Sequence, residues 1–232
     1  MKLLPHELLI KTGPVDHADW NFRPFLGLVS RTRFHLARHM LGEARFHRLL
    51  EVGYGSGVLM PELALHTKEL YGVDVHCHAN VVSEKLEKAN IHAELYNAPV
   101  TSLPFPDRYF DCIVGVSVFE FVDDLETACS EIERVLSDRG FFLVVTPNDS
   151  PILDAGLRLL TRESAKKDFG DRRKKVIPAL CKRFALVEER PAPWAHASML
   201  KLYTGLKLAR RISPHTSVAV ESHSAGPLRQ AS

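Results

Sequence analysis

Three glycines in alternation, Gly53, Gly55 and Gly57, follow an apolar run that begins at Leu49. Glycines let the backbone turn tightly and let a ligand approach it, and the N–H groups at the start of a following helix attract an anion. Glu51 lies two residues before the first glycine, where its carboxylate would repel a pyrophosphate. An amino acid fits better, because its ammonium can face Glu51 while its carboxylate meets the backbone amides. The pattern therefore favours a ligand with a free amino-acid end, such as that of methionine.

Asp74 supplies a second carboxylate twenty-one residues after Gly53. At the tip of a second strand, about 20 residues past a glycine loop, an acid can accept hydrogen bonds from both ribose hydroxyls. The dinucleotide fingerprint is spaced GxGxxG, whereas this loop reads GxGxG. The two features favour a nucleoside joined to an amino acid over a nicotinamide dinucleotide. A glycine turn without a ligand, and an Asp74 that only caps a turn, are the structural alternatives.

Strands and helices alternate from residue 46 onward, and this order predicts how the loop and the acid are positioned. Apolar runs bounded by turn residues predict strands over 48–53, 69–75, 92–98, 109–119, 140–147, 184–190 and 198–209. Repeated strand–helix–strand units need parallel pairing with helices on both faces of the sheet. The connection between the last two strands is too short for a parallel crossover, so they should form an antiparallel hairpin. We expect an α/β fold with a doubly wound sheet.

Composition limits the number of domains and the compartment. With 232 residues, 45% hydrophobic and 25% charged, the chain suits one globular domain with attached segments. We expect a helical cap over 1–45, a domain over 46–211 with a substrate-side helical insertion at 150–183, and a disordered tail over 212–232. Four scattered cysteines without a CxxC pair argue against disulfides and a zinc cluster. Without a recognisable secretory signal or membrane span, a cytoplasmic protein is expected.

From Leu49 to Asn148 the chain resembles class I S-adenosylmethionine-dependent methyltransferases, particularly the type 11-like enzymes that act on small molecules. The matching stretches are LLEVGYGSG, YGVDV, LYNAPVTSLPFPDRYFDCIVGVSVFEFVDD and ERVLSDRGFFLVVTPN. The resemblance implies a Rossmann-like, seven-stranded sheet of order 3-2-1-4-5-7-6 with strand 7 antiparallel, which agrees with the hairpin. It also implies S-adenosylmethionine as cofactor and S-adenosylhomocysteine as product.

The resemblance assigns cofactor contacts by position. The three glycines would line the methionine end, Glu51 would face its ammonium and Asp74 would hold the ribose. The other assigned positions are Tyr54 beside the cofactor, Val75 and His76 at the adenine, Asn97 and Ala98 at the adenine edge, and Ser117 and Val118 under the methionine. The family often has Asp where this chain has Asn97, whose amide can still accept a hydrogen bond from the adenine amino group.

No single residue is identified as a catalytic base. Methyl transfer from a sulfonium depends mainly on alignment, and a base matters most for hydroxyl or carbon acceptors. Candidates are His17, Glu120 and His196, with Asp19 and Asp123 beside them, and for each of them a role as a solvated or capping residue is favoured. The His that commonly follows the Glu in the family is Phe121 here, so a mechanism using that His is absent. No pattern of metal ligands is recognised, so no metal is expected.

A basic stretch at residues 157–183 holds ten cations against three acids. With the apolar segment before it, 152–183 predicts peripheral contact with an anionic membrane, attraction of an acidic substrate, or simply a solvated basic face, which is favoured. The net charge of +2 argues against a nucleic-acid partner, and no obligate protein partner is indicated. We expect a methyltransferase acting on an unidentified small molecule, with lipid-like acceptors included. The alternative is a catalytically silent scaffold that binds S-adenosylmethionine.

Overall fold

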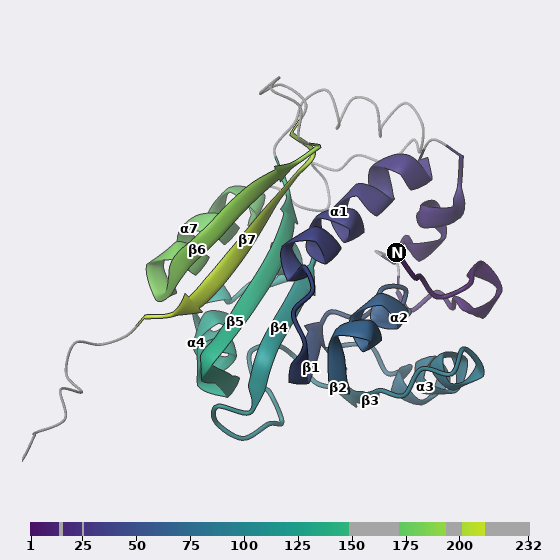
Figure 1. Ribbon diagram of the computed structural model, residues 1–232, viewed down its shortest axis with the longest axis horizontal. Helices are drawn as coiled ribbons and strands as arrows, with labels where there is room; N and C mark the ends of the chain where they lie inside the picture. The colour runs from purple at the N-terminus through teal and green to yellow at the C-terminus, as the bar shows by residue number, and fades with distance from the viewer. Residues whose placement is uncertain (14–15, 25, 149–171, 194–200, 212–232) are drawn as a thin grey trace, which may run out of the picture.

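A computed structural model describes residues 1–13, 16–24, 26–148, 172–193 and 201–211 (Figure 1). Seven strands form one sheet in the order β3-β2-β1-β4-β5-β7-β6. The strands are β1 (Phe46–Val52), β2 (Thr67–Asp74), β3 (Glu94–Asn97), β4 (Phe110–Val116), β5 (Leu136–Pro147), β6 (Phe184–Ala192) and β7 (Tyr203–Arg210). Neighbours from β3 to β5 pair in parallel, whereas β7 is antiparallel to both β5 and β6. The predicted sheet order and the antiparallel seventh strand are confirmed.

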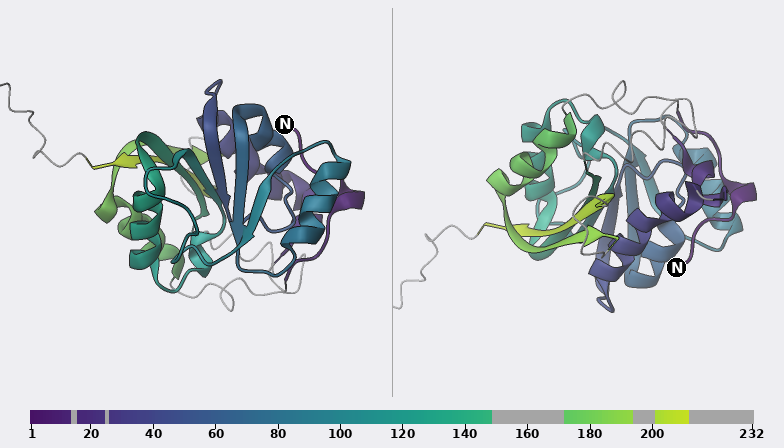
Figure 2. Two further views of the ribbon diagram at one scale, coloured as in Figure 1. Left: turned by 90° about the horizontal axis from the view of Figure 1, so that it is seen from below. Right: turned by 90° about the horizontal axis from the view of Figure 1, so that it is seen from above.

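Helices cover both faces of this sheet (Figure 1, Figure 2). The α-helices are α1 (Leu26–Leu41), α2 (Met60–Leu63), α3 (Ala79–Lys88), α4 (Leu125–Val135) and α7 (Arg172–Arg183). The short 3-10 helices are η1 (His6–Leu8), η2 (Ala18–Phe22), η3 (Ala64–His66) and η4 (Phe119–Phe121). Among the described residues, no helix is long and apolar enough to cross a membrane.

The central strands are buried on both sides, and alternate residues serve the two faces. Leu50, Ile113 and Phe142 belong to the hydrophobic cluster that includes the apolar faces of α4 and α7. Their chain neighbours Leu49 and Leu143 belong to the cluster that includes α1, α2 and α3. Successive side chains on a strand point to opposite faces, so a nearly continuous apolar run is what such a strand requires.

Several predicted boundaries are wrong, and the backbone explains most of them. Strand β1 ends at Val52 and β4 at Val116, because Gly53 and Ser117 adopt positive φ angles of 72° and 54°, which extended strands do not use. Strand β5 begins at Leu136 and not at the predicted residue 140, since Leu136 has an extended backbone and pairs with Phe110. The predicted disordered tail at 212–232 and most of the predicted helical insertion at 150–183 lie outside the described residues.

Candidate active site

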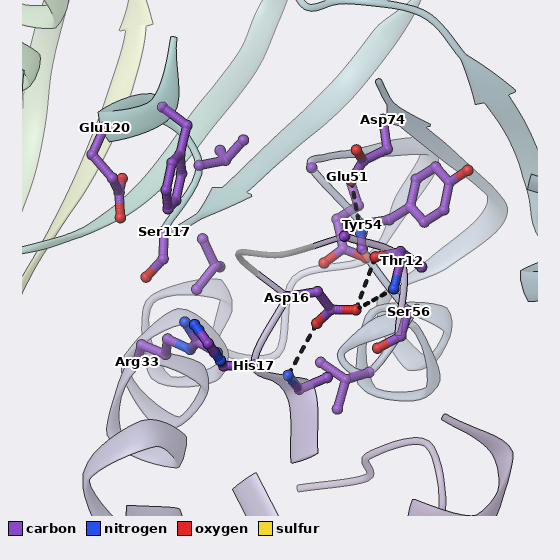
Figure 3. A pocket seen from close by; sticks show the side chains of 18 of the residues that line it. Thr12, Asp16, His17, Arg33, Glu51, Tyr54, Ser56, Asp74, Ser117 and Glu120 are labelled. Carbon is purple, nitrogen blue, oxygen red and sulfur yellow. Dashed lines mark hydrogen bonds between the residues drawn. The ribbon is translucent and has the colours of Figure 1, made fainter. Parts of the chain in front are cut away.

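A cavity of about 540 Å³ opens at the carboxyl ends of the parallel strands. In an open α/β sheet this edge is where ligands bind, because neighbouring strands lead their connections to opposite faces there. The loops after β1, β2 and β4, the N-terminal segment, one side of α1 and the start of α7 all contribute to its wall. Residues that lie far apart in the chain therefore line one cavity (Figure 3).

The glycine loop forms the floor of the cavity after β1. Gly53 and Gly55 line the cavity and have φ angles of 72° and 52°, a region that residues with a side chain rarely occupy. A Cβ atom on Gly53 would also overlap the side chain of Val118. Gly57 does not line the cavity; a Cβ there would lie 3.2 Å from Val82, so this glycine lets the loop pack against α3. The alternating glycines thus serve both ligand approach and packing.

Asp74 connects the end of β2 to the glycine loop. Its Oδ2 accepts a hydrogen bond from the N–H of Gly55 at 2.8 Å, and its Oδ1 accepts one from the N–H of Val75 at 2.7 Å. Oδ1 also accepts a longer hydrogen bond from the N–H of His76 at 3.4 Å, so the second lone pair of Oδ2 is the acceptor left for a ligand. The side chain lines the cavity and is 15% exposed, as a residue that holds a diol would need to be.

Glu51 is the most unusual side chain at this end of the cavity. It is 4% exposed, and its Oε2 atom has no hydrogen-bond partner in the described part of the chain. Burial raises the pKa of the Glu51 carboxyl well above its ordinary value, and the nearby charge of Asp74 raises it further. A buried carboxyl without a partner destabilises the fold unless a ligand satisfies it. A ligand ammonium would do so, and the donor set of this loop therefore suits an amino acid.

Two aromatic rings complete the wall beside Asp74. The ring of Tyr54 lies edge-on to His76, with centroids 4.9 Å apart, and the Nε2 atom of His76 lies 2.9 Å from the carbonyl oxygen of Gly55. The hydroxyl of Tyr54 is buried without a hydrogen-bond partner among the described residues, as is that of Ser56. Both residues line the cavity, so a polar ligand would satisfy atoms that the described protein leaves without partners.

Asn97 and Ala98 play different roles at the end of β3. The side-chain amide of Asn97 donates to the carbonyl of His76 at 2.6 Å, and Asn97 is not part of the cavity wall. Ala98 does line the cavity, and its N–H donates to the carbonyl of Asp74 at 2.9 Å. Asn97 therefore braces the segment 74–76 in this structure.

The opposite side of the cavity holds Ser117 and Glu120 (Figure 3). Glu120 is 1% exposed, and both its Oε2 atom and the Oγ atom of Ser117 have no hydrogen-bond partner in the described ranges. Burial raises the pKa of Glu120 to about 7, although the charges of Arg173 and Arg33 oppose the shift. A carboxyl that titrates near neutral pH is suited to accept a proton.

The other candidate bases are separated by the structure. His17 lines the cavity and its ring stacks on that of Trp20, with centroids 4.1 Å apart. Asp19 forms an exposed ion pair with Arg23 at 2.6 Å and does not line this cavity. Asp123 pairs with Arg172 at 2.9 Å, also at the surface. His196 lies outside the described residues. Glu120 and His17 are therefore the two candidates that the structure places in the cavity wall.

Sequence reasoning missed three polar residues on the Glu120 side, namely Arg33, Arg173 and Tyr203. For Arg33 a signal existed, because Leu26, Val29, Ser30 and Arg33 follow helical spacing and all line the cavity from α1. Arg173 belongs to the basic stretch, and nothing in the sequence distinguishes it from the neighbouring cations. Tyr203 offered no signal, since its position depends on how β7 pairs with β5.

The described part of the basic stretch forms α7, which packs on α4. Arg172, Lys182 and Arg183 pair with the acidic residues Asp123, Glu126 and Glu133 respectively. Three of its cations are thus used in ion pairs within the protein, which favours the solvated-face interpretation over membrane contact. The preceding residues 152–171 lie outside the described ranges.

Comparison with known proteins identifies one family. A family model described as a methyltransferase domain matches residues 50–144. The chain is 32% identical over 121 residues to the uncharacterized methyltransferase YcgJ of Bacillus subtilis, covering 50% of this chain and 47% of that protein. It is 33% identical over 110 residues to the ubiquinone/menaquinone biosynthesis C-methyltransferase UbiE of Erwinia tasmaniensis, covering 45% and 44%. The chain therefore spans less than half the length of these curated relatives.

Solved structures agree on the fold. The N-methyltransferase NodS of Bradyrhizobium japonicum, in complex with S-adenosylhomocysteine, superposes with a TM-score of 0.60 at 18% identity. The match covers 86% of this chain and 94% of that one. At this level of identity the comparison shows a shared fold.

Proposed function

Since residues 50–144 form a domain of the class I, S-adenosylmethionine-dependent methyltransferase family, we propose that this chain transfers a methyl group from S-adenosylmethionine to a small-molecule acceptor. The proposal depends on the buried Oε2 atom of Glu51, which has no hydrogen-bond partner among the described residues and belongs to a residue of the same cavity wall as Asp74 and the glycine loop. This arrangement supplies one site for an ammonium and another for a ribose.

Each end of the cofactor has a matching group in the chain. Glu51 would hold the ammonium, Asp74 the ribose hydroxyls, and the backbone at Gly53 and Gly55 would allow the close approach that a side chain prevents. When bound, S-adenosylmethionine supplies an electrophilic methyl group: the acceptor's electron pair forms the new bond to the methyl carbon, and the broken carbon–sulfur bond leaves its electrons on sulfur. Alignment of this in-line displacement contributes roughly 7–11 kcal/mol in well-oriented reactions.

Glu120 is the residue best suited to take the acceptor's proton. It is buried, lines the same cavity and has a pKa near 7, so a fraction of it is ionised at neutral pH. A hydroxyl acceptor would donate its proton to Glu120 as the new bond forms, and Glu120 would return that proton to water after product release. His17 is the alternative within the described cavity wall.

A scaffold that binds S-adenosylmethionine without turnover is the competing function. The cofactor contacts cannot separate the two, because both need them, whereas transfer of label can. We expect methyl-labelled S-adenosylmethionine, incubated with this chain and a small-molecule extract, to pass label to a product other than the cofactor. An Asp74→Asn variant should transfer less label at subsaturating S-adenosylmethionine. Cofactor binding without transfer to any extract component would support the scaffold.

A further inference from the structure

We propose that the methyl acceptor is a small organic acid, whose anionic group is held by Arg33 and Arg173 on the side of the cavity formed by Ser117 and Glu120. This inference rests on the proposed function, since it names the class of acceptor that such an enzyme would use. It starts from two guanidinium groups that come from different helices, α1 and α7, and line the same cavity.

Arg33 lies on the cavity side of α1, and no ion pair of its guanidinium is found within the described ranges. Its guanidinium carbon lies 4.8 Å from the ring centroid of Phe34, and its Nε atom is buried with no hydrogen-bond partner in the described part of the chain. A buried guanidinium donor without an acceptor costs free energy that a carboxylate or phosphate can recover through charge-assisted hydrogen bonds. The side chain therefore lines the cavity where an acceptor would bind and carries a donor without an acceptor among the described residues.

Arg173, from α7, lines the same cavity as Arg33. The charges of Arg33 and Arg173 both lower the pKa of Glu120, and both act on Tyr203 in the same way, so the four groups share one region. Figure 3 shows Arg33, Ser117 and Glu120 on one side of the cavity, away from Asp74. Two arginines face one carboxyl, which titrates near neutral pH. Among the described residues, this side of the cavity wall therefore holds two guanidinium groups and one carboxyl.

Asp16 is a further carboxylate of the cavity wall. It is held by its own segment, because its Oδ2 accepts from the N–H and the hydroxyl of Thr12 and its Oδ1 accepts from the N–H of Ala18. The wall also contains a set of apolar side chains, namely Leu26, Val29, Phe121, Val122 and Pro147. A molecule with an apolar body and one acidic group is complementary to this surface.

A simpler interpretation is that the arginines only offset the charge of buried Glu120. The two interpretations differ in a measurable way. If Arg33 only offsets the charge of Glu120, the replacement of Arg33 should no longer change ligand affinity in a variant whose Glu120 has been made neutral. If Arg33 binds the acceptor, its replacement should still weaken binding of an acid in a Glu120→Gln background.

The test uses matched probes with the full chain saturated by S-adenosylhomocysteine. Calorimetry compares 4-hydroxybenzoate with 4-hydroxybenzamide and octanoate with octanamide, and phenyl phosphate tests whether phosphate replaces carboxylate. In at least one pair we expect the acid to bind about tenfold or more tightly than the amide, the gain typical of a charge-assisted hydrogen bond. Arg33→Met should abolish this preference, in the Glu120→Gln background as well, and Arg33→Lys should restore part of it. Arg31→Met, on the same helix but outside the cavity wall, should keep it.

Three results would overturn the inference. They are equal affinity for acid and amide in both pairs, no binding of either acid, and a preference for the acid that survives Arg33→Met. Tighter binding of phenyl phosphate than of the carboxylates would assign the anion as a phosphate and support the same site. Binding of S-adenosylhomocysteine is measured first. If S-adenosylhomocysteine does not bind, the proposed function is contradicted. If it binds but the chain shows no preference for the acids, only the acceptor class is wrong.

Discussion

The carboxylate of Asp74 accepts a hydrogen bond from the backbone N–H of Gly55 at 2.8 Å, which ties the end of β2 to the loop after β1. A single side chain therefore holds the glycine loop and still offers a lone pair of Oδ2 to a ligand. This contact brings the loop and the acid, twenty-one residues apart from Gly53 to Asp74, to one cavity wall.

Replacing Asp74 tests the ribose contact. Asp74→Asn should weaken the affinity for S-adenosylhomocysteine by about 10- to 100-fold, because the amide has one acceptor fewer and its NH₂ would face the Gly55 donor. 5′-Methylthioadenosine, which keeps the ribose but lacks the amino-acid end, should lose affinity to a similar degree. Calorimetry measures both. Asp111→Asn is the matched control, since Asp111 accepts from the N–H groups of His47 and Arg48, outside the cavity wall.

Replacing Glu51 tests the ammonium contact. Glu51→Gln should weaken S-adenosylhomocysteine by about tenfold or more, since a buried charge-assisted hydrogen bond is lost. The affinity for 5′-methylthioadenosine, which has no ammonium, should stay nearly unchanged. The same calorimetric titrations separate the two effects. If both ligands lost affinity equally, Glu51 would be a structural residue and not the partner of an ammonium.

The raised pKa of Glu51 predicts how binding depends on pH. In the free protein burial keeps the pKa of this carboxyl well above its usual range, whereas a bound ammonium would lower it. Binding then favours the ionised form, so the affinity for S-adenosylhomocysteine should rise as pH increases through the raised pKa. Dissociation constants measured from pH 5.5 to 8 check this. The Glu51→Gln variant should show a flatter profile, and an unchanged slope would argue against the assignment.

Glu120 should make the protein less stable as pH rises. Its folded pKa of about 7 lies above the ordinary value of 4.5, so the unfolded chain ionises first and the folded state loses stability between these two values. The side chain of the Glu120→Gln variant cannot ionise, so this variant should keep the stability that the parent chain loses. The difference in free energy of unfolding between variant and parent should therefore be larger at pH 8 than at pH 4.5, by on the order of 2–3 kcal/mol. Urea denaturation at the two values measures the difference. A constant difference would mean that Glu120 titrates normally.

Gly53→Ala should damage both the fold and the site. The positive φ costs about 1–2 kcal/mol for a residue with a side chain, and the new methyl would also displace Val118. Gly42→Ala is the matched control, because Gly42 has a φ of 60° but open space around it. Urea denaturation should therefore show a larger loss for Gly53→Ala than for Gly42→Ala. Equal losses would show that the space beside Val118 is not critical.

Much of the fold follows from local patterns. The strand–helix alternation predicts the parallel core, and the short connection before residue 198 predicts the antiparallel β7 without reference to any relative. Leu136 shows the limit of this reasoning: its burial follows from its apolar side chain, but whether it ends a helix or begins a strand depends on its pairing with Phe110. That pairing is a tertiary contact, which periodicity does not report.

The candidate site also contains residues that the sequence predicts and residues that it does not. Glu51, Gly53 and Asp74 could be found from their spacing, because the loop, the strand tip and the chemistry of the ligand are all local features. Tyr203 could not, since it reaches the cavity from β7 through packing of distant segments. The helical spacing of Arg33 places it on one face of α1, but it does not say that this face lines the cavity. The sequence is therefore informative about the cofactor side and much less so about the acceptor side.

A crystal structure of this chain with S-adenosylhomocysteine would show whether Glu51 and Asp74 bind the cofactor. We expect the ligand in the cavity, with its ammonium within hydrogen-bond distance of Glu51 and its ribose hydroxyls on Asp74. An empty cavity at saturating ligand, or an amino-acid end turned away from Glu51, would contradict it.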